Sequence, residues 1–329
     1  MADAAVSDES QPDSQQDEAQ IQRLQAALTA CGVDGPVDGP VVGAQRLKGQ
    51  SHESWRIDRE NEPPVVLRIE PRRGILPPYD LPAEARLLGQ LRQAGIPVPR
   101  VLGVCADLGP PDSAGRGGIV IEWIDGDVLI RGQVQPDAAR AYCETLRQIH
   151  TLDWRTAGID WLPEPPPSGP ALRERAEIMN RLQSFGVADL PHIRRLREAL
   201  DGRLPDSPPP MLVHGDVNFG NFIIGPGKPS QVAAVLDWEQ THLGAPLSDW
   251  GRLAAEDLLG NLNLTDAARQ VMKDTLQLYD RSEEDLHYWT LHQLYKHSSA
   301  TGALTIIHGW DPNQIARMYT EPTNRLLST

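Results

Sequence analysis

The sequence has few cysteines and no long apolar run. Its three cysteines, Cys31, Cys105 and Cys143, are scattered without a CxxC spacing. This scarcity excludes a disulfide framework and a zinc site, and it favours a reducing compartment. No segment approaches the roughly 20 apolar residues that a membrane helix needs, and the first residues lack the basic and then apolar pattern of a secretory signal. We therefore expect a cytoplasmic protein that is neither exported nor anchored in a membrane.

Basic residues are also missing from the first 20 positions. That stretch contains only acidic charges, at Asp3, Asp8, Glu9, Asp13, Asp17 and Glu18. It is rich in Ser and Gln and cannot bury enough apolar surface to offset its ordering entropy, so we expect residues 1–20 to form a disordered acidic tail. The net charge is −14 and no basic stripe is present. Nucleic acid is therefore disfavoured as a partner, because its binding depends on clustered Lys and Arg.

The 329 residues exceed the usual size of one hydrophobic core, which predicts two lobes. The first half has apolar residues at helical spacing in 17–31 and in 80–94. It also has short apolar runs that end in turns, which are typical of strands, at 42–47, 54–58, 65–69, 101–106 and 118–124. This pattern predicts a small lobe over residues 21–125, built on a five-stranded antiparallel sheet.

The second half, residues 126–329, has mainly helical periodicity and predicts a larger helical lobe. Two strand-like segments, near 211–224 and at 232–236, interrupt the helices. The expected helices cover 137–150, 171–185, 190–200, 247–258, 265–279, 283–300 and 313–327.

The interrupting strands are followed by polar motifs. Residues 212–221 read LVHGDVNFGN, and residues 235–239 read VLDWE. Asp216, Asn221 and Asp237 thereby offer oxygen ligands on two short segments that two strands could bring together. Magnesium takes one or two such ligands from protein and completes its octahedron with water and phosphate oxygens, so this set suits a bound nucleotide better than a closed metal cage.

The pattern H-G-D-x-x-x-x-N, followed by an apolar strand and D-x-[DE], resembles the aminoglycoside phosphotransferase-like family of small-molecule kinases, which includes the choline kinase type. The resemblance implies an α+β, bilobal, protein-kinase-like fold and a phosphotransferase that uses ATP, with GTP as the alternative, together with Mg²⁺. It also implies that Asp216 is the catalytic base and that Asn221 and Asp237 are magnesium ligands. Glu239 would contact either a second metal ion or only water.

Two further residues of these motifs have structural interpretations. We expect His214 to brace the catalytic loop, since the site already has a carboxylate that can accept the proton. Asp249 resembles the buried Asp that starts a helix in this family, and a capping role would explain it without catalysis.

The nucleotide-binding residues are predicted less sharply. Gly49 permits close backbone approach and Ser51 could donate to phosphate oxygens, although an ordinary hairpin loop explains the same residues. Arg68 stands where the family usually has a phosphate-binding lysine, and Glu84 is its expected partner. The substitution changes the geometry of phosphate binding because a guanidinium is a planar fork. A partly exposed ion pair of little energetic worth is the alternative.

The segment around Ile119–Gly126 resembles the linker between lobes in this family. By this resemblance, the backbone carbonyl of Glu122 and the amide of Ile124 would meet the edge of the adenine. A core strand that ends in a turn is compatible with the same residues.

The acceptor is expected to be a small molecule with a hydroxyl group, bound by the C-terminal helices. Candidates for its lining are Asp285, Trp289, His292, Tyr295, Lys296, His297 and Trp310. Motifs near His150 and Trp238 resemble the branch of the family that is associated with acyl-CoA dehydrogenases, which favours a hydroxylated acyl metabolite. The alternatives are an aminoglycoside or macrolide antibiotic kinase and a catalytically silent pseudokinase that acts as a binding module.

Overall fold

The computed structural model describes residues 14–32, 40–47, 52–72, 79–109, 115–128, 135–202, 204–205, 209–260 and 265–328. These residues fall into two compact units. The first contains the described residues up to Ala85 and those from Val101 to Trp123, and the second contains Arg86–Arg100 and the described residues from Ile124 onward. The division lies inside helix α2 (Leu81–Gln93), so the second half of this helix packs with the larger unit.

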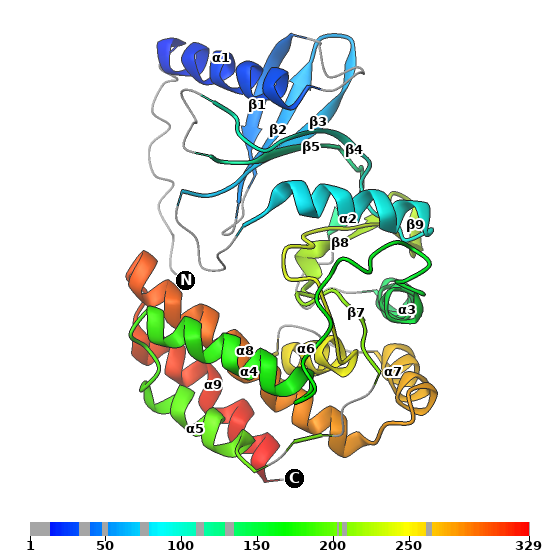
Figure 1. The fold of residues 1–329 in the computed structure, drawn as a ribbon, viewed down its shortest axis with the longest axis vertical. Coiled ribbons are helices and arrows are strands. Elements are labelled where there is room, and N and C mark those ends of the chain that lie inside the picture. Colours follow the sequence, from blue (N-terminus) through cyan, green and yellow to red (C-terminus); the bar gives the residue numbers. More distant parts are fainter. Residues whose placement is uncertain are drawn as a thin grey trace, which may run out of the picture. The chain divides into compact units, whose positions relative to one another are not determined.

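The first unit is built on a five-stranded antiparallel sheet with the order β1-β2-β3-β5-β4 (Figure 1). The strands are β1 (Val41–Arg46), β2 (Glu53–Arg59), β3 (Glu62–Ile69), β4 (Val101–Cys105) and β5 (Gly118–Glu122). Their side chains alternate between the two faces of the sheet, and central strand β3 is buried over its last three residues. The sheet confirms the architecture that the short apolar runs predict.

Strand β3 starts earlier than the sequence pattern indicates. Pro63 and Pro64 lie inside it, although we expected them in the connection before it. The β2–β3 pairing is irregular between Ile57 and Arg59, and β5 pairs with β3 only from Val65 onward. The prolines therefore occupy the part of the strand where a missing N–H costs few ladder hydrogen bonds.

Helix α1 (Ser14–Cys31) packs on one face of this sheet. Leu24 and Leu28 are fully buried in a cluster with Leu67 and Val120 from the strands, as the helical spacing predicts. The helix begins at Ser14, so residues 14–20 of the segment that we expected to be disordered are helical. The rest of the expected tail, residues 1–13, lies outside the described residues.

The second unit is mainly helical. Its core forms where α8 (Glu283–His308) packs against several other helices and buries Leu291, Leu294 and Tyr295. The other helices are α3 (Pro136–Thr151), α4 (Pro170–Ser184), α5 (Pro191–Leu200), α6 (Leu247–Leu258), α7 (Asp266–Leu278) and α9 (Pro312–Leu327). Helix α8 extends eight residues beyond the predicted end and stops at Gly309, which has a left-handed backbone (φ 67°).

Two small antiparallel sheets interrupt these helices. In one, β7 (Met211–Val213) pairs with β10 (His242–Gly244); in the other, β8 (Phe222–Gly225) lies between β6 (Asp127–Val128) and β9 (Lys228–Val235). We did not predict β6 and β10, because strands of two or three residues carry no readable alternation. Among the described helices, none is both long and apolar enough to cross a bilayer.

Candidate active site

Strand β7 delivers the HGD motif to the end of a buried two-stranded sheet. Leu212 and Val213 are fully buried, and Val213 lies opposite His242 of β10. At Gly215 the chain turns with φ 86°, and a Cβ atom there would lie 2.4 Å from the carbonyl oxygen of Gln240. Only glycine fits this position, because any side chain would be strained and would collide with backbone.

Side chains hold every backbone polar atom of the tripeptide His214–Asp216. The amides of His214 and Gly215 both donate to Asp249 at 2.9 Å, and the amide of Asp216 donates to Nδ1 of His214 at 3.2 Å. The carbonyl oxygen of His214 accepts from Thr241 Oγ1 (3.4 Å), and that of Gly215 accepts from Lys296 Nζ (2.8 Å). The carbonyl oxygen of Asp216 accepts from Asn221 Nδ2 (2.9 Å). Four of these six hydrogen bonds involve residues at least 27 positions away, so the loop conformation depends mainly on the tertiary structure.

Asp249 does not cap its own helix. The N-cap residue of α6 is Pro246, and no side-chain capping hydrogen bond forms at the start of this helix. The capping role that we expected for Asp249 is therefore wrong. The carboxylate instead accepts from the catalytic loop and from His150 Nε2 at 2.9 Å. Burial alone would raise the pKa of Asp249, but the hydrogen bond and charge of His150, together with His214 and the Gly215 amide, lower it. The buried carboxylate therefore stays ionised as the anchor of the loop.

His214 has the bracing geometry that we expected. Its Nε2 lies 3.0 Å from the carbonyl oxygen of Leu236, and its Nδ1 accepts from the amide of Asp216. These partners require the tautomer with the proton on Nε2, because a carbonyl oxygen only accepts. With both ring nitrogens bound to backbone, the fully buried imidazole connects the HGD loop to the segment that carries Asp237.

The carboxylate of Asp216 is partly accessible, with 22% of its side chain exposed. Its Oδ2 accepts a hydrogen bond from Asn218 Nδ2 at 3.1 Å, and its Oδ1 lies 3.9 Å from Arg252 Nη2. Arg252 also forms a 2.7 Å ion pair with Glu256, one turn further along α6. A carboxylate that is oriented in this way and still reached by solvent can accept a proton from a bound hydroxyl.

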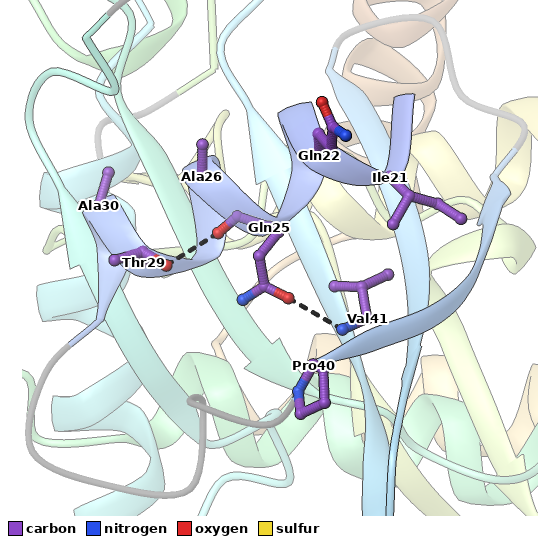
Figure 2. Close-up of a pocket in the computed structure, with 8 residues that line it drawn as sticks. All are labelled: Ile21, Gln22, Gln25, Ala26, Thr29, Ala30, Pro40 and Val41. Atoms are coloured by element: carbon purple, nitrogen blue, oxygen red, sulfur yellow. Dashed lines mark hydrogen bonds between the residues drawn. The ribbon is translucent and has the colours of Figure 1, made fainter. Parts of the chain in front are cut away.

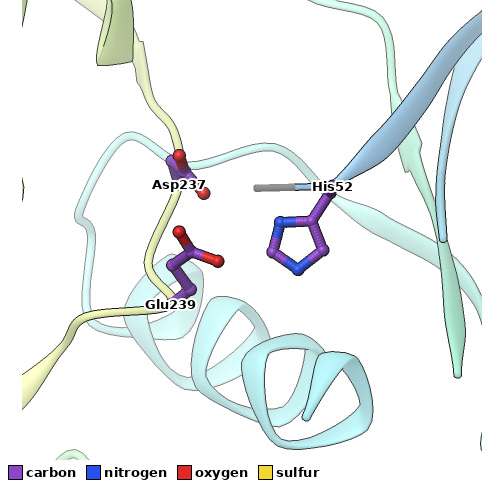
Figure 3. Close-up of side chains that lie close together, drawn as sticks. All are labelled: His52, Asp237 and Glu239. Carbon is purple, nitrogen blue, oxygen red and sulfur yellow. The ribbon is translucent and has the colours of Figure 1, made fainter. Parts of the chain in front are cut away.

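The predicted metal ligands flank two paired strands: Asn221 directly precedes β8, and Asp237 and Glu239 follow the end of β9. Asn221 ends the 3-10 helix η1 (Phe219–Asn221), and its carbonyl oxygen accepts from the amide of Leu236 at 2.7 Å. Asp237 is the residue after Leu236 and has a left-handed backbone, with φ 63°. Figure 3 shows Asp237 and Glu239 on the same stretch of chain, where a carboxylate oxygen of one lies within 4.8 Å of a carboxylate oxygen of the other.

This donor set fits magnesium. The side-chain amide of Asn221 donates from Nδ2 to the carbonyl oxygen of Asp216. Its Oδ1 is the atom that can bind a cation. Amide and carboxylate oxygens are the ligands that this hard cation takes from proteins. The left-handed backbone of Asp237 is uncommon outside glycine, Asn and Asp, and such conformations cluster at functional sites.

The first unit contains the pair Arg68 and Glu84. Arg68, on β3, forms an ion pair with Glu84 on α2, and their side chains are only 10% and 3% exposed. The alternative of a partly exposed pair is therefore wrong. Arg68 Nη2 also lies 3.0 Å from Nδ1 of His52, and burial together with the Arg68 charge lowers the pKa of His52 to about 3. Phosphate binding by Arg68 stays a prediction.

The remaining nucleotide-binding predictions are not tested by the geometry. Gly49 and Ser51 lie outside the described residues. Glu122 is the last residue of β5 and pairs with Val65, and Ile124 follows it by two positions. The predicted backbone contacts of Glu122 and Ile124 to adenine stay predictions.

The structure assigns most of the expected acceptor-lining residues to other roles. Trp289, His292 and Tyr295 are buried in the helical core, and Asp285 forms a capping box with Ser282 at the start of α8. Lys296 contacts the catalytic loop. Sequence reasoning missed Thr241 and Arg252, and the only signal was the place of Arg252 one helical turn after Asp249.

A cavity of about 630 Å³ lies beside α1 in the first unit (Figure 2). Its lining has no charged side chain and consists of Ile21, Gln22, Gln25, Ala26, Thr29, Ala30, Pro40 and Val41. Two hydrogen bonds join residues drawn there: Gln25 Oε1 accepts from the amide of Val41 at 2.9 Å, and Thr29 Oγ1 donates to the Gln25 carbonyl oxygen at 3.0 Å. This cavity contains none of the residues that the motifs predict for chemistry.

Comparison with known proteins places this geometry in a family. A family model described as the phosphotransferase enzyme family matches residues 43–285. Acyl-CoA dehydrogenase family member 10 of Mus musculus is 30% identical over 221 residues, which are 64% of this chain and 20% of that protein. The chain thus spans about a fifth of the length of this curated relative.

Solved structures share the fold at low sequence identity. A protein of Ralstonia eutropha, provisionally assigned as an aminoglycoside phosphotransferase, superimposes with a TM-score of 0.67 at 18% identity, covering 93% of this chain and 98% of the other. A spectinomycin phosphotransferase in complex with ADP and spectinomycin gives a TM-score of 0.56 at 15% identity, covering 92% and 98%. Since the family model covers most of the sequence, the chain belongs to the phosphotransferase enzyme family and has the α+β kinase-like fold that its motifs predict.

Proposed function

We propose that the protein is an ATP- and Mg²⁺-dependent phosphotransferase that moves the γ-phosphate to a hydroxyl group of a small molecule. One observation carries the proposal: Asp216 is held on a loop whose backbone is fixed by six side-chain hydrogen bonds, beside the segment of Asn221 and Asp237. Phosphoryl transfer needs little covalent chemistry from the protein and depends mainly on such positioning.

In this mechanism the Asp216 carboxylate accepts a hydrogen bond from the acceptor hydroxyl and aligns its oxygen with the γ-phosphorus. It takes up the hydroxyl proton as the new P–O bond forms and the bond from the γ-phosphorus to the β–γ bridging oxygen breaks, so that ADP leaves. Asn221 and Asp237 would hold magnesium, with Glu239 beside them. The ion, when bound, neutralises charge on the phosphate oxygens. His214 and Asp249 keep the loop in place and touch no reacting atom.

We propose that the first unit binds the nucleotide and that the second carries catalysis and acceptor binding. Arg68 is the residue through which the first unit would bind phosphate, because its guanidinium stays charged and Glu84 fixes its position. Gly49 and Ser51 would supply further phosphate contacts, and the backbone of Glu122 and Ile124 would contact adenine. The ADP bound in the spectinomycin phosphotransferase supports nucleotide use by this fold.

For the acceptor we favour a hydroxylated acyl metabolite. The supporting observation is the relationship to acyl-CoA dehydrogenase family members, which exceeds in sequence identity the relationship to the antibiotic phosphotransferases. An antibiotic acceptor is the second candidate, because the spectinomycin enzyme shares the fold. The complete set of Asp216, Asn221 and Asp237 argues against a silent pseudokinase.

The test is transfer of label from γ-labelled ATP, with and without Mg²⁺, to a panel of hydroxyacyl compounds, amino alcohols and antibiotics. We expect Mg²⁺-dependent labelling of a hydroxyl compound by the wild type. The variant Asp216→Asn should fold and bind nucleotide as the wild type does but transfer at least about 100-fold more slowly, because it lacks the proton acceptor. Undiminished transfer by this variant would remove Asp216 from the mechanism, and labelling of antibiotics alone would reject the acyl acceptor.

A further inference from the structure

Lys296 makes an unusual contact from the middle of helix α8. Its Nζ donates at 2.8 Å to the carbonyl oxygen of Gly215, which belongs to the peptide unit that leads into Asp216. Because this peptide unit is planar, the orientation of the Gly215 carbonyl is coupled to the direction in which the Asp216 side chain leaves the backbone. A charged donor is a strong choice for this position, since hydrogen bonds from ionised groups are about twice as strong as neutral ones.

A buried carboxylate on α4 exerts an electrostatic influence on this lysine. Glu174, on α4, is 4% exposed, and it accepts hydrogen bonds from His242 Nε2 at 3.3 Å and from Ser248 Oγ at 3.2 Å. Ser248 in turn accepts from Gln293 Nε2 at 2.7 Å. Burial alone would raise the pKa of Glu174, but the hydrogen bond from His242 and the charges of His242, His292 and Lys296 lower it to about 2.

The ring of His242 lies between two oxygen atoms. Its Nδ1 lies 2.9 Å from the carbonyl oxygen of Gln240, and its Nε2 faces the carboxylate of Glu174. Both oxygens can only accept, so both hydrogen bonds form together only when the ring carries a proton on each nitrogen. Glu174 and His242 are then an ion pair next to strand β7, which continues into the catalytic loop.

Lys296 depends on the negative charges around it. Burial lowers the pKa of its ammonium group, while the carboxylates of Glu174, Asp216 and Asp249 oppose that shift. Among them Glu174 is the largest opposing influence. Asp216 and Asp249 contribute smaller opposing charges, so Glu174, which also binds His242 and Ser248, is the main electrostatic support of the ammonium group.

We propose that Lys296 is a positioning residue for phosphoryl transfer: through its hydrogen bond to the Gly215 carbonyl oxygen it fixes the peptide unit that carries Asp216. The proposal deepens the proposed function and rests on it. It adds a helix of the acceptor-binding unit to the machinery of the transfer step. A small displacement of the base is enough to matter, because misplacement by about 1 Å can lower a rate by about 100-fold.

The first test compares wild type with Lys296→Met, which keeps the length of the side chain and removes its charge and donors. The probe is MgATP alone, with water as the acceptor and release of inorganic phosphate as the readout. We expect kcat to fall by about 10- to 100-fold with KM for MgATP changed by less than twofold. The control is Lys273→Met, an exposed lysine of α7, which should hydrolyse MgATP like the wild type. Unchanged kcat in Lys296→Met would overturn the proposal.

The second test asks whether Glu174 acts through Lys296. Glu174→Gln should also lower kcat, and the double variant should be no slower than Lys296→Met, because Glu174 would act only through the hydrogen bond that Lys296 donates. Independent effects that multiply in the double variant would refute the role of Glu174 as electrostatic support of Lys296.

The third test does not need activity. Hydrogen exchange of the peptide that covers residues 211–222 should be faster in Lys296→Met than in wild type and in Lys273→Met, because the loop loses a restraint. Unchanged exchange there would refute the contact even if the kinetics changed. If the wild type labels no hydroxyl compound in the transfer assay while exchange changes as expected, the proposed function fails and the contact of Lys296 with the loop stands.

Discussion

Asp249 of α6 holds His214 by its backbone amide, across 35 positions of sequence and at a distance of 2.9 Å. The same carboxylate binds the amide of Gly215 and Nε2 of His150, so one buried side chain connects α6, α3 and the catalytic loop. A carboxylate suits this place because both of its oxygens accept hydrogen bonds, and the two amides and the imidazole that face it all donate. The residue thus supports the loop through structure alone.

Replacement of Asp249 by Asn should therefore be severe. An amide turns an NH₂ group toward at least one of the three donors and leaves it unsatisfied in a buried place. We expect the free energy of unfolding to fall by about 2 to 4 kcal/mol, with a lower melting temperature and a loss of phosphotransfer. The matched control is Asp257→Asn on the same helix, whose partner Arg269 is half exposed, so that this pair contributes little. Equal stability of the two variants in thermal melts would contradict the anchoring role.

Two substitutions of Asp237 distinguish the cost of its backbone conformation from the loss of its carboxylate. Asn tolerates the left-handed region almost as well as Asp, whereas Ala pays about 1 kcal/mol or more for it. Asp237→Asn should therefore melt like the wild type without ligands, and Asp237→Ala should be less stable by about that amount. Both variants should bind MgATP more weakly in titration calorimetry, because a carboxylate ligand of the metal is lost. Stability of Asp237→Ala equal to that of Asp237→Asn would show that the φ of 63° imposes no strain.

The long elements and the catalytic motif could be predicted from the sequence because they carry strong local signals. Helix α6 begins and ends where its apolar spacing places it, and the expected strands of the first unit recur in the sheet within three residues at either end. Strand β10 has three residues and exists only because β7 pairs with it, so no periodicity announces it. Elements defined by a distant partner are invisible to local patterns.

The support of the catalytic loop shows the same limit more clearly. Motif spacing predicts Asp216, Asn221 and Asp237 as site residues, because their order along the chain is itself the signal. The contacts of Lys296 and Thr241 join residues 81 and 27 positions apart and follow no spacing rule. Asp249 was noticed in the sequence but received the wrong partner, since a residue at the start of a helix predicts a local cap and not a contact 35 positions away.

His292 should make the protein sensitive to acid. It is fully buried, neither ring nitrogen has a hydrogen-bond partner among the described residues, and burial lowers its pKa from 6.5 to about 4. The charge of Glu174 opposes this shift, and Lys296, Arg175 and His242 add to it. As pH falls below 6.5, the unfolded chain binds a proton at this site before the folded protein does. Stability is therefore lost on acidification toward pH 4 and restored above 6.5.

The contribution of His292 between pH 7 and pH 5 is about 2 kcal/mol, from the difference between its folded and unfolded proton binding. His292→Leu removes the titrating ring at a site where an apolar side chain of similar size loses no hydrogen bond. The variant should lose less stability than the wild type in urea melts between pH 7 and pH 5, by roughly that amount, while the two proteins run parallel between pH 8 and pH 7. If the free energies of unfolding of the two proteins also run parallel between pH 7 and pH 5, the pKa of His292 is the same in the folded protein as in the unfolded chain, and the prediction is wrong.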